Sequence, residues 1–410
     1  MMGFDTGLLL FYIGTFITLF LGMFYLITFF ENRDRLEDPK MKRFPTLSIL
    51  VPAFNESETI AKTIRSLIAL SYPDNKKQII VIDDGSSDET YAIAKSFPEV
   101  TALRQENGGK GKALNLGLQH ATGELVAVMD ADSFVTKGAL RAMIGHFRND
   151  NIMAVTPTLK VHKPKSFLQR IQYVEYLFSV LFRKIFAYLD SVYVTPGPFS
   201  IYRKVFFDRH GGFDEHNITE DMEVAFRIQS LGYDIENSLN AEVFTVTPSN
   251  LWVLLRQRVR WYTGMIENLW QYRRLFGPKT GNLGVFVLPM AVISVVIVLA
   301  YLVYYGVLFG QLVASSIHQL WLVDLDFALA TSGSLVGFSP VQWVNPVSIL
   351  ILTLVVFTVI LFGLAKLYSK DKEKDVGVNL IIYVLTYGPI FSLFWLTTIA
   401  YKLMQVKVRW

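Results

Sequence analysis

Four long, almost uncharged apolar segments constrain the fold of this chain more than any other feature. They run over residues 7–30, about 285–313, 346–367 and 378–404. Each is long enough to cross the hydrocarbon core of a bilayer as a helix. The 410 residues are 52% hydrophobic and 18% charged, which is too apolar for an ordinary soluble domain and too charged for a protein made only of spans. The sequence therefore predicts a soluble domain fused to membrane helices.

The basic residues around these segments indicate on which side of the membrane the soluble part lies. The first segment lacks the basic start and the small-residue cleavage site of a signal peptide, so we expect an anchor. The residues after it include Arg33, Arg35, Lys40, Lys42 and Arg43. Because lysine and arginine accumulate in cytoplasmic loops, we expect a multi-pass integral protein of the cell membrane whose next domain is cytoplasmic.

The later loops fit this orientation until the last segment. The loop after the second segment holds Asp324 and Asp326 but no Lys or Arg, and the next one holds Lys366, Lys370, Lys372 and Lys374. If the last segment crosses the membrane, its end at Lys407 and Arg409 faces outside, against the rule. A kink at Gly388-Pro389 allows a re-entrant hairpin as the alternative.

Composition excludes several classes of function. The net charge of +4 gives no general attraction to nucleic acid, which is therefore not an expected partner. The absence of cysteine rules out thiol catalysis, disulfides and thiolate metal sites. The six histidines form no spaced cluster, so a zinc site is not expected.

Residues from about 46 to 250 show the alternation of an α/β domain. Strand patterns at 47–51, 78–82, 100–104 and 125–129 alternate with helical patterns at 58–70, 87–96 and 112–120. This alternation predicts a mainly parallel, doubly wound sheet.

Two amphipathic helices follow the strands. For residues 166–190, a core helix and a helix on the membrane surface explain the wide apolar face equally well. The second helix begins at 251 and carries a polar stripe together with Trp and Tyr, which favours the membrane surface and makes membrane lipids expected partners. We thus expect a span and linker at 1–45, a cytoplasmic domain at 46–250, an interfacial helix at 251–280, and membrane helices at 281–410.

Polar residues follow three of the predicted strands. Asp130-Ala-Asp132 comes directly after the strand at 125–129, and Pro52-Ala-Phe-Asn55-Glu56 and Asp83-Asp84-Gly85 follow two earlier strands. Ligands of open α/β sheets bind at the carboxyl ends of strands, so we expect one shared crevice. The Asp130 and Asp132 carboxylates suit Mg²⁺ or Mn²⁺, which also binds substrate phosphates. A solvated turn is the alternative for an Asp-x-Asp sequence alone.

Three further motifs have chemical and structural interpretations. Asn107 to Lys112 is a glycine-rich loop that can approach a phosphate, although a flexible surface loop is the alternative. Thr219-Glu220-Asp221 offers a carboxylate as general base, and the same residues suit a helix N-terminus; both can hold at once. Gln257-x-x-Arg260-Trp261 offers a guanidinium for a diphosphate and a ring for sugar stacking, or an interfacial anchor.

In this order, the motifs resemble those of the family-2 membrane glycosyltransferases. They run from about residue 50 to 261, and the flanking apolar segments fit the same type. The nearest members are the processive synthases of hyaluronan, chitin, cellulose and poly-N-acetylglucosamine. The resemblance implies an α/β GT-A domain, a nucleotide-sugar donor, inversion at the anomeric carbon and a Mg²⁺ or Mn²⁺ cofactor.

The resemblance also assigns roles to residues. The donor site would be formed by Pro52, Asn55, Glu56, Asp83, Asp84, Lys110 and Asp130. Asp132, with Asp130, would hold the metal that neutralises the leaving diphosphate. Asp221 would be the base that deprotonates the acceptor hydroxyl, with Glu220 and Thr219 shaping the acceptor end. Gln257, Arg260 and Trp261 would close over the diphosphate and the acceptor sugar.

Two functions are compatible with these roles. The first is a processive transferase that extends a β-linked polysaccharide from a UDP-sugar, such as UDP-GlcNAc, and passes it through the membrane. The alternative is a non-processive enzyme that adds one sugar to a membrane lipid. A transporter or scaffold lacks support, because the apolar segments hold almost no ionisable residues. The few spans would enclose a small lumen, which a homo-oligomer or an accessory subunit would complete.

Overall fold

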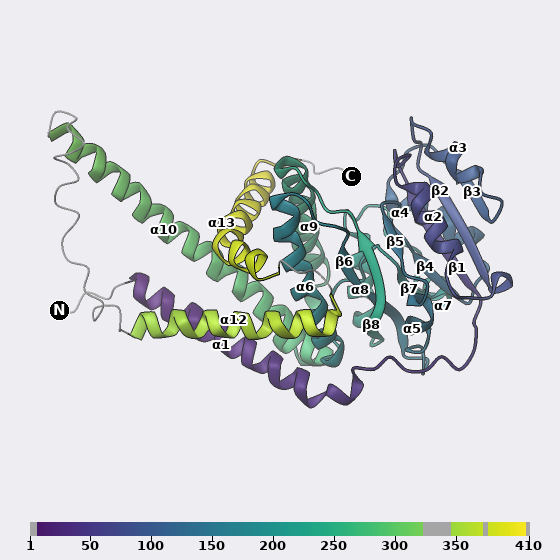
Figure 1. Ribbon diagram of the computed structural model, residues 1–410, viewed down its shortest axis with the longest axis horizontal. Helices are drawn as coiled ribbons and strands as arrows, with labels where there is room; N and C mark the ends of the chain where they lie inside the picture. Colours follow the sequence, from purple (N-terminus) through teal and green to yellow (C-terminus); the bar gives the residue numbers. More distant parts are fainter. Residues whose placement is uncertain (1–5, 323–345, 372–375, 407–410) are drawn as a thin grey trace. The chain divides into compact units, whose positions relative to one another are not determined.

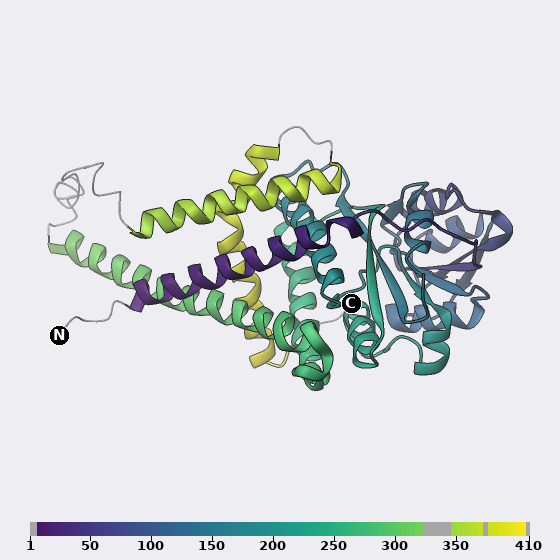
Figure 2. The ribbon, with the colours of Figure 1, turned by 90° about the horizontal axis from the view of Figure 1, so that it is seen from below.

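The computed structural model describes residues 6–322, 346–371 and 376–406 (Figures 1 and 2). Asp324, Asp326, Lys372, Lys374, Lys407 and Arg409, which entered the predicted orientation, lie outside these residues. The described chain packs as two compact units. One comprises Ile27–Pro289 and the chain from Phe362 onward, and the other comprises the chain up to Leu26 and Met290–Leu361. The first unit contains every predicted site residue.

The first unit is built on one mixed sheet of eight strands, in the order β3-β2-β1-β4-β7-β6-β8-β5. Strands β1 to β4 are parallel to one another, as the sequence predicts, whereas β5 and β7 run antiparallel to their neighbours. The strands are β1 (Leu47–Ala53), β2 (Lys77–Asp83), β3 (Val100–Arg104), β4 (Leu125–Val128), β5 (Ser133–Val135), β6 (Ile152–Val161), β7 (Ser200–Arg203) and β8 (Asp234–Thr245).

Helices cover both faces of this sheet. Leu47, Ile49 and Val51 of β1 face one side, where they pack with α2 (Ile60–Ile68), α3 (Thr90–Lys95) and α5 (Ala139–Ile144). Leu50 faces the other side, which is covered by α4 (Lys110–His120), α7 (Lys204–His210) and α8 (Glu220–Ser230). Because successive side chains of a strand point to opposite faces, a strand that is apolar on both must be covered on both.

The two amphipathic helices are packed inside the first unit. Helix α6 (Phe167–Tyr188) begins with a capping box of Ser166 and Gln169 and contacts β6, β8 and α13 (Val376–Leu403). Helix α9 (Leu251–Gln271) begins at the N-cap Asn250. Its apolar residues Leu254, Leu255 and Val259 pack with Phe394 of α13. One face of α6 therefore joins the core and another packs on an apolar helix, and its position at the membrane surface stays a prediction.

Four described helices are long and apolar enough to cross a membrane: Thr6–Glu31, Leu283–Gln319, Pro346–Ser369 and Gly377–Leu403. They correspond to α1 (Thr6–Glu31), to a π-helical turn (Leu283–Val287) continued by α10 (Leu288–Leu322), to α12 (Pro346–Ser369) and to α13. The remaining short elements are single 3₁₀ turns at Arg33–Arg35, Asp74–Lys76, Arg273–Leu275 and Pro278–Thr280. The chain is thus a membrane protein, and the domain boundaries drawn from the sequence stay predictions.

A buried cluster of charges fastens the linker after α1 to the domain. Asp38 accepts hydrogen bonds from His146 Nε2 at 2.8 Å and from Ser238 Oγ at 2.9 Å. Glu236 pairs with Arg148 at 2.7 Å and lies 3.7 Å from His146 Nδ1. Burial alone would lower the pKa of His146, but the two neighbouring carboxylates raise it above its ordinary value. Burial acts in the opposite sense on Asp38 and Glu236, yet His146 holds the pKa of both below the ordinary value.

This cluster predicts a pH window for stability. A raised pKa of His146 stabilises the fold below the ordinary histidine pKa, and the effect is lost as the pH rises through the raised value. The lowered pKa values of Asp38 and Glu236 stabilise the fold above the ordinary carboxyl pKa values, and that effect is lost as the pH falls through the lowered values. The contribution of this cluster to the melting temperature of the purified protein should therefore be largest between about pH 5 and pH 6.5. Asp38→Asn should flatten the decline above that window; an unchanged decline would contradict the assignment.

Candidate active site

The polar segments after β1 and β2 lie side by side at the carboxyl end of the sheet. Ala53 is opposite Asp83 in the parallel register, and the Asp84 amide donates to the Ala53 carbonyl at 2.8 Å. Asn55, which adopts φ 54°, accepts a hydrogen bond from the Ser87 amide at 2.9 Å. The Glu56 amide donates to Thr90 Oγ1 at 2.8 Å. These contacts give the Pro52 to Glu56 segment a fixed shape against the start of α3.

Asp84 shapes the glycine-rich loop. Its carboxylate accepts hydrogen bonds from the Gly108 and Gly109 amides, both at 2.9 Å. Gly85 has φ +78°, and a Cβ there would lie 2.8 Å from the Asn107 amide nitrogen, so only glycine allows the loop to come this close. The neighbouring Asp83 is fully buried and pairs with Arg104 Nε at 3.1 Å. The hydrogen bonds from the loop amides to Asp84 therefore fix the conformation of the glycine-rich loop.

Lys110 links two of the acidic motifs. It is the first residue of α4, directly after Gly109, and its Nζ lies 2.8 Å from Asp130 Oδ1 and 2.7 Å from Glu220 Oε1. Burial opposes its charge, but the surrounding carboxylates of Asp130, Glu220 and Asp221 outweigh burial and raise the pKa of Lys110. The ammonium is thus permanently charged at the point where the end of β4 meets the start of α8.

Gly197 was not predicted from the sequence and closes this cluster from another side. A Cβ at this position would lie 2.6 Å from both Lys110 Nζ and Asp130 Oδ1. Its position between two prolines, Pro196 and Pro198, is a signal of a rigid, close-fitting turn that could have drawn attention to it.

The side chain of Thr63 stabilises the Asp130-Ala-Asp132 turn. Its hydroxyl contacts the carbonyl oxygens of Ala131 and Ser133, both at 2.7 Å. Burial, and then the charge of Asp130, raise the pKa of Asp132 to about 7, and Glu56 adds to the effect. Burial and the same Asp130 charge also raise the pKa of Glu56. The carboxylates of Glu56, Asp130 and Asp132 therefore lie close enough to repel one another, which leaves an excess of negative charge in this region.

The Thr219-Glu220-Asp221 motif forms the start of α8. Thr219 occupies the N-cap position, although its side chain makes no capping hydrogen bond, and Asp221 Oδ1 accepts from the Met222 amide at 2.9 Å. The Asp221 carbonyl accepts from Thr195 Oγ1 at 2.7 Å. Burial, followed by the charge of Glu220, raises the pKa of Asp221 to about 6, while Lys110 and Arg260 pull it down. A carboxyl poised near neutrality is suited to proton transfer.

Helix α9 brings the Gln257-x-x-Arg260-Trp261 motif to the same region. The charge of Arg260 acts on Asp221, and all three motif residues are partly exposed. Arg258, which the sequence reasoning missed, is buried and makes two 2.8 Å hydrogen bonds to Glu175 of α6. Its guanidinium lies 4.3 Å from the Trp261 ring centroid. The lone carboxylate of α6, at Glu175, was the available signal for a buried partner.

Comparison with known proteins identifies the family. A family model described as "Glycosyl transferase family 2" matches residues 48–211. Poly-beta-1,6-N-acetyl-D-glucosamine synthase of Staphylococcus epidermidis is 32% identical over 283 residues, covering 66% of this chain and 68% of that protein. The enzyme of the same name from Staphylococcus aureus is 32% identical over 281 residues, or 67% of each chain. The chain belongs to glycosyl transferase family 2.

A solved structure confirms the GT-A fold of this glycosyltransferase. A mannosyltransferase from Pyrobaculum calidifontis, in complex with GDP-Man and Mn²⁺, aligns with a TM-score of 0.54 and 19% sequence identity. The alignment covers 79% of this chain and 97% of that chain. At this level of identity the likeness shows the fold alone.

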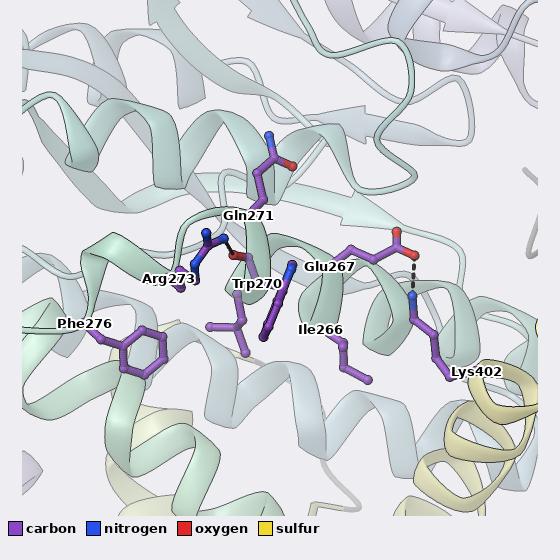
Figure 3. A pocket seen from close by; sticks show the side chains of 8 residues that line it. Ile266, Glu267, Trp270, Gln271, Arg273, Phe276 and Lys402 are labelled. Atoms are coloured by element: carbon purple, nitrogen blue, oxygen red, sulfur yellow. Dashed lines mark hydrogen bonds and ion pairs between the residues drawn. The ribbon is translucent and has the colours of Figure 1, made fainter.

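An open pocket of about 650 Å³ lies beside the C-terminal part of α9 (Figure 3). Glu267 and Lys402 pair across it at 2.6 Å, and Arg273 donates to the Trp270 carbonyl at 3.2 Å. Its lining comprises Ile266, Glu267, Leu269, Trp270, Gln271, Arg273, Phe276 and Lys402, and includes none of the predicted site residues. The C-terminal end of α9, the helix that carries the Gln257 motif, therefore lines a pocket that contains none of the motif residues.

Proposed function

We propose that this protein transfers N-acetylglucosamine from UDP-GlcNAc to a growing β-linked polysaccharide and passes the product through the membrane. The observation that carries the proposal is the 32% identity to poly-beta-1,6-N-acetyl-D-glucosamine synthases over two thirds of both chains. The geometry supports it, because the acidic motifs, Lys110 and the Arg260 helix converge at one end of the sheet.

In the proposed reaction Asp221 takes the proton of the acceptor hydroxyl as its oxygen attacks C1 of the donor sugar. The bond from C1 to the diphosphate breaks on the opposite face, so configuration inverts and UDP leaves. Lys110 and Arg260 offset the charge that develops on the leaving diphosphate. Trp261 presents its ring to the acceptor sugar, beside Gln257, and Glu220 and Thr219 shape that end of the site.

The donor end is assigned to the ends of β1 and β2. Pro52, Asn55, Glu56 and Asp83 form the proposed nucleoside pocket, and Asp84 supports it by holding the glycine-rich loop. Asp130, bound to Lys110, contacts the nucleotide side. In this proposal Lys110 contacts both Asp130 at the donor end and Glu220 in the motif that carries the base.

We propose Asp132 and Asp130 as the residues that hold Mg²⁺ or Mn²⁺. Among the described residues no three His, Cys, Asp or Glu side chains converge closely enough to hold a metal ion by themselves. Mg²⁺ is usually bound by one or two carboxylates together with phosphate oxygens of the substrate, so the residues present fit this ion. The crowded charge of Asp130, Asp132 and Glu56 gives a cation a favourable place. When bound, the ion would neutralise the diphosphate.

The test is to incubate purified membranes with labelled UDP-GlcNAc and to determine the size of the product. We expect a long polymer that forms with Mg²⁺ or Mn²⁺ and not with a chelator, and Asp132→Asn should abolish it because the metal loses a ligand. Asp150→Asn makes the same change at a fully exposed carboxylate, so it is the control and should stay active. A glycolipid carrying a single sugar would overturn processive synthesis in favour of lipid glycosylation. An active Asp132→Asn variant that needs no metal would overturn the ligand assignment.

The pKa of Asp221 predicts how activity depends on pH. A general base must be deprotonated, so kcat/KM should fall as the pH drops below about 6, the value to which the pKa of Asp221 is raised. Asp221→Asn should lower kcat by at least about 100-fold while UDP-GlcNAc still binds. Transfer at a near-normal rate in this variant would show that the base lies elsewhere.

We propose that the catalytic domain is cytoplasmic and that α13 is re-entrant, which returns the C-terminal end to the cytoplasmic side. The chain between α12 and α13 and the end of α13 each contact a helix of the catalytic unit. Asp371, shortly before α13, accepts a hydrogen bond from Tyr173 of α6 at 2.7 Å, and Lys402 pairs with Glu267 of α9 (Figure 3). A span would carry the Lys402 end to the other side of the membrane. The homo-oligomer or accessory subunit predicted to complete a small lumen belongs to the same proposal.

Cysteine labelling tests this topology, since the chain has no cysteine of its own. Gln405→Cys and Asn75→Cys should react with a membrane-impermeant maleimide only after the cells are permeabilised. Gln319→Cys, near the end of α10, should react in intact cells. Labelling of Gln405→Cys in intact cells would mean that α13 crosses the membrane.

A further inference from the structure

One face of α9 is turned toward the start of α8. Arg260, Gly264 and Asn268 are spaced four residues apart and therefore share a face of the helix. Gly264 lies so close to Thr219 that a Cβ on it would overlap the Thr219 side chain. Arg260 is the residue of this face whose charge acts on Asp221. The helix with the diphosphate-binding arginine therefore touches the helix with the base.

Two asparagines lock this contact. Asn268 is fully buried, and its Nδ2 donates to Thr219 Oγ1 at 2.9 Å. Asn217 Nδ2 donates to Asn268 Oδ1 at 2.8 Å. The Thr219 amide and hydroxyl in turn donate to Asn217 Oδ1 at 3.0 and 3.3 Å, so the three residues form one closed network. Buried amide groups that are fully hydrogen-bonded specify a single arrangement of the elements that carry them.

A second contact keeps α9 from rotating on this network. Tyr272, just beyond α9, donates to Glu223, one turn after the start of α8, and its ring packs on Phe226. Glu223 is held by Arg227 at 3.1 Å. The two helices are thus joined by two separate contacts. The network of Asn217, Thr219 and Asn268 is the contact nearer to Asp221 in the sequence.

We infer that Asn268 is a positioning residue, which, through Thr219 and Asn217, sets the distance between Arg260 and Asp221 for the transfer reaction. The inference rests on the proposed function. It adds residues that lie outside the acidic and Gln257 motifs. Asn268 has no direct role in the chemistry; it holds the cation on α9 at the point where the base on α8 and the leaving diphosphate need it.

The position of Arg260 has its own signature in the titration of Asp221. The charged and titratable groups with the largest effects on Asp221, or on which it acts most strongly, are Glu220, Lys110, Arg260, Asp130, Arg183 and Tyr202. Of these, only Arg260 is carried by α9. If α9 loosens, Arg260 recedes, and the acid limb of kcat/KM must move to higher pH because an opposite charge is lost. A loss of folded protein alone lowers activity at every pH and leaves the limb where it was.

The experiment compares the pH profile of kcat/KM for UDP-GlcNAc in the full-length wild type with the profiles of Asn268→Ala and Asn217→Ala. We expect kcat/KM to fall by about 10- to 100-fold from misplacement. We also expect the acid limb to rise by about one pH unit in both variants. Asn217→Ala reaches the same network from the loop before α8, so one variant remains informative if the other does not fold. Rates are divided by the amount of monodisperse protein.

Glu267→Ala is the matched control. It changes the residue next to Asn268 on the same helix, but its partner is Lys402, so the acid limb should stay in place. An acid limb that stays in place in both asparagine variants would overturn the inference while leaving the proposed function intact. Absence of polymer synthesis by the wild type would overturn the proposed function instead.

Discussion

The ammonium group of Lys110 holds the site together, because its two carboxylate partners come from elements that are far apart in the sequence. Asp130 follows β4, Glu220 opens α8, and Lys110 itself begins α4. Removing one member of such a buried group leaves an uncompensated charge, at a cost of about 3–5 kcal/mol. Each of the three elements is therefore fixed by the other two. The glycine-rich loop, which Asp84 holds from behind, brings the lysine to this point.

Local pattern was sufficient to predict the first half of the fold. The strands β1 to β4 and the helices between them have clear periodicity and short connections, and they appear where the sequence predicts them. The antiparallel pairing of β5 and β7 was not predicted, because the local sequence of Ser133–Val135 and of Ser200–Arg203 does not determine with which strand each will pair. Pairing of that kind is decided by the whole sheet.

The site shows the same division. The order of the motifs was enough to select Asp130, Asp221 and Arg260 as candidates, because each belongs to a short pattern with a chemical meaning. Gly197 and the pair of Arg258 with Glu175 lay beyond that reasoning. The flanking prolines of Gly197 and the lone carboxylate of α6 mark these residues as unusual, but neither signal states which distant residue each will contact until the fold brings them together. Asp84 belonged to a predicted motif, but its hydrogen bonds to the loop amides were equally invisible in the sequence.

Consecutive residues of α9 face different partners: Asn268 is bonded to the start of α8, and Glu267 to the end of α13. A recombination boundary placed anywhere within α9 therefore separates at least one of these residues from its partner. Chimeras that exchange product specificity between relatives should move α8, α9 and the end of α13 as one block, even though these segments are widely separated in the gene.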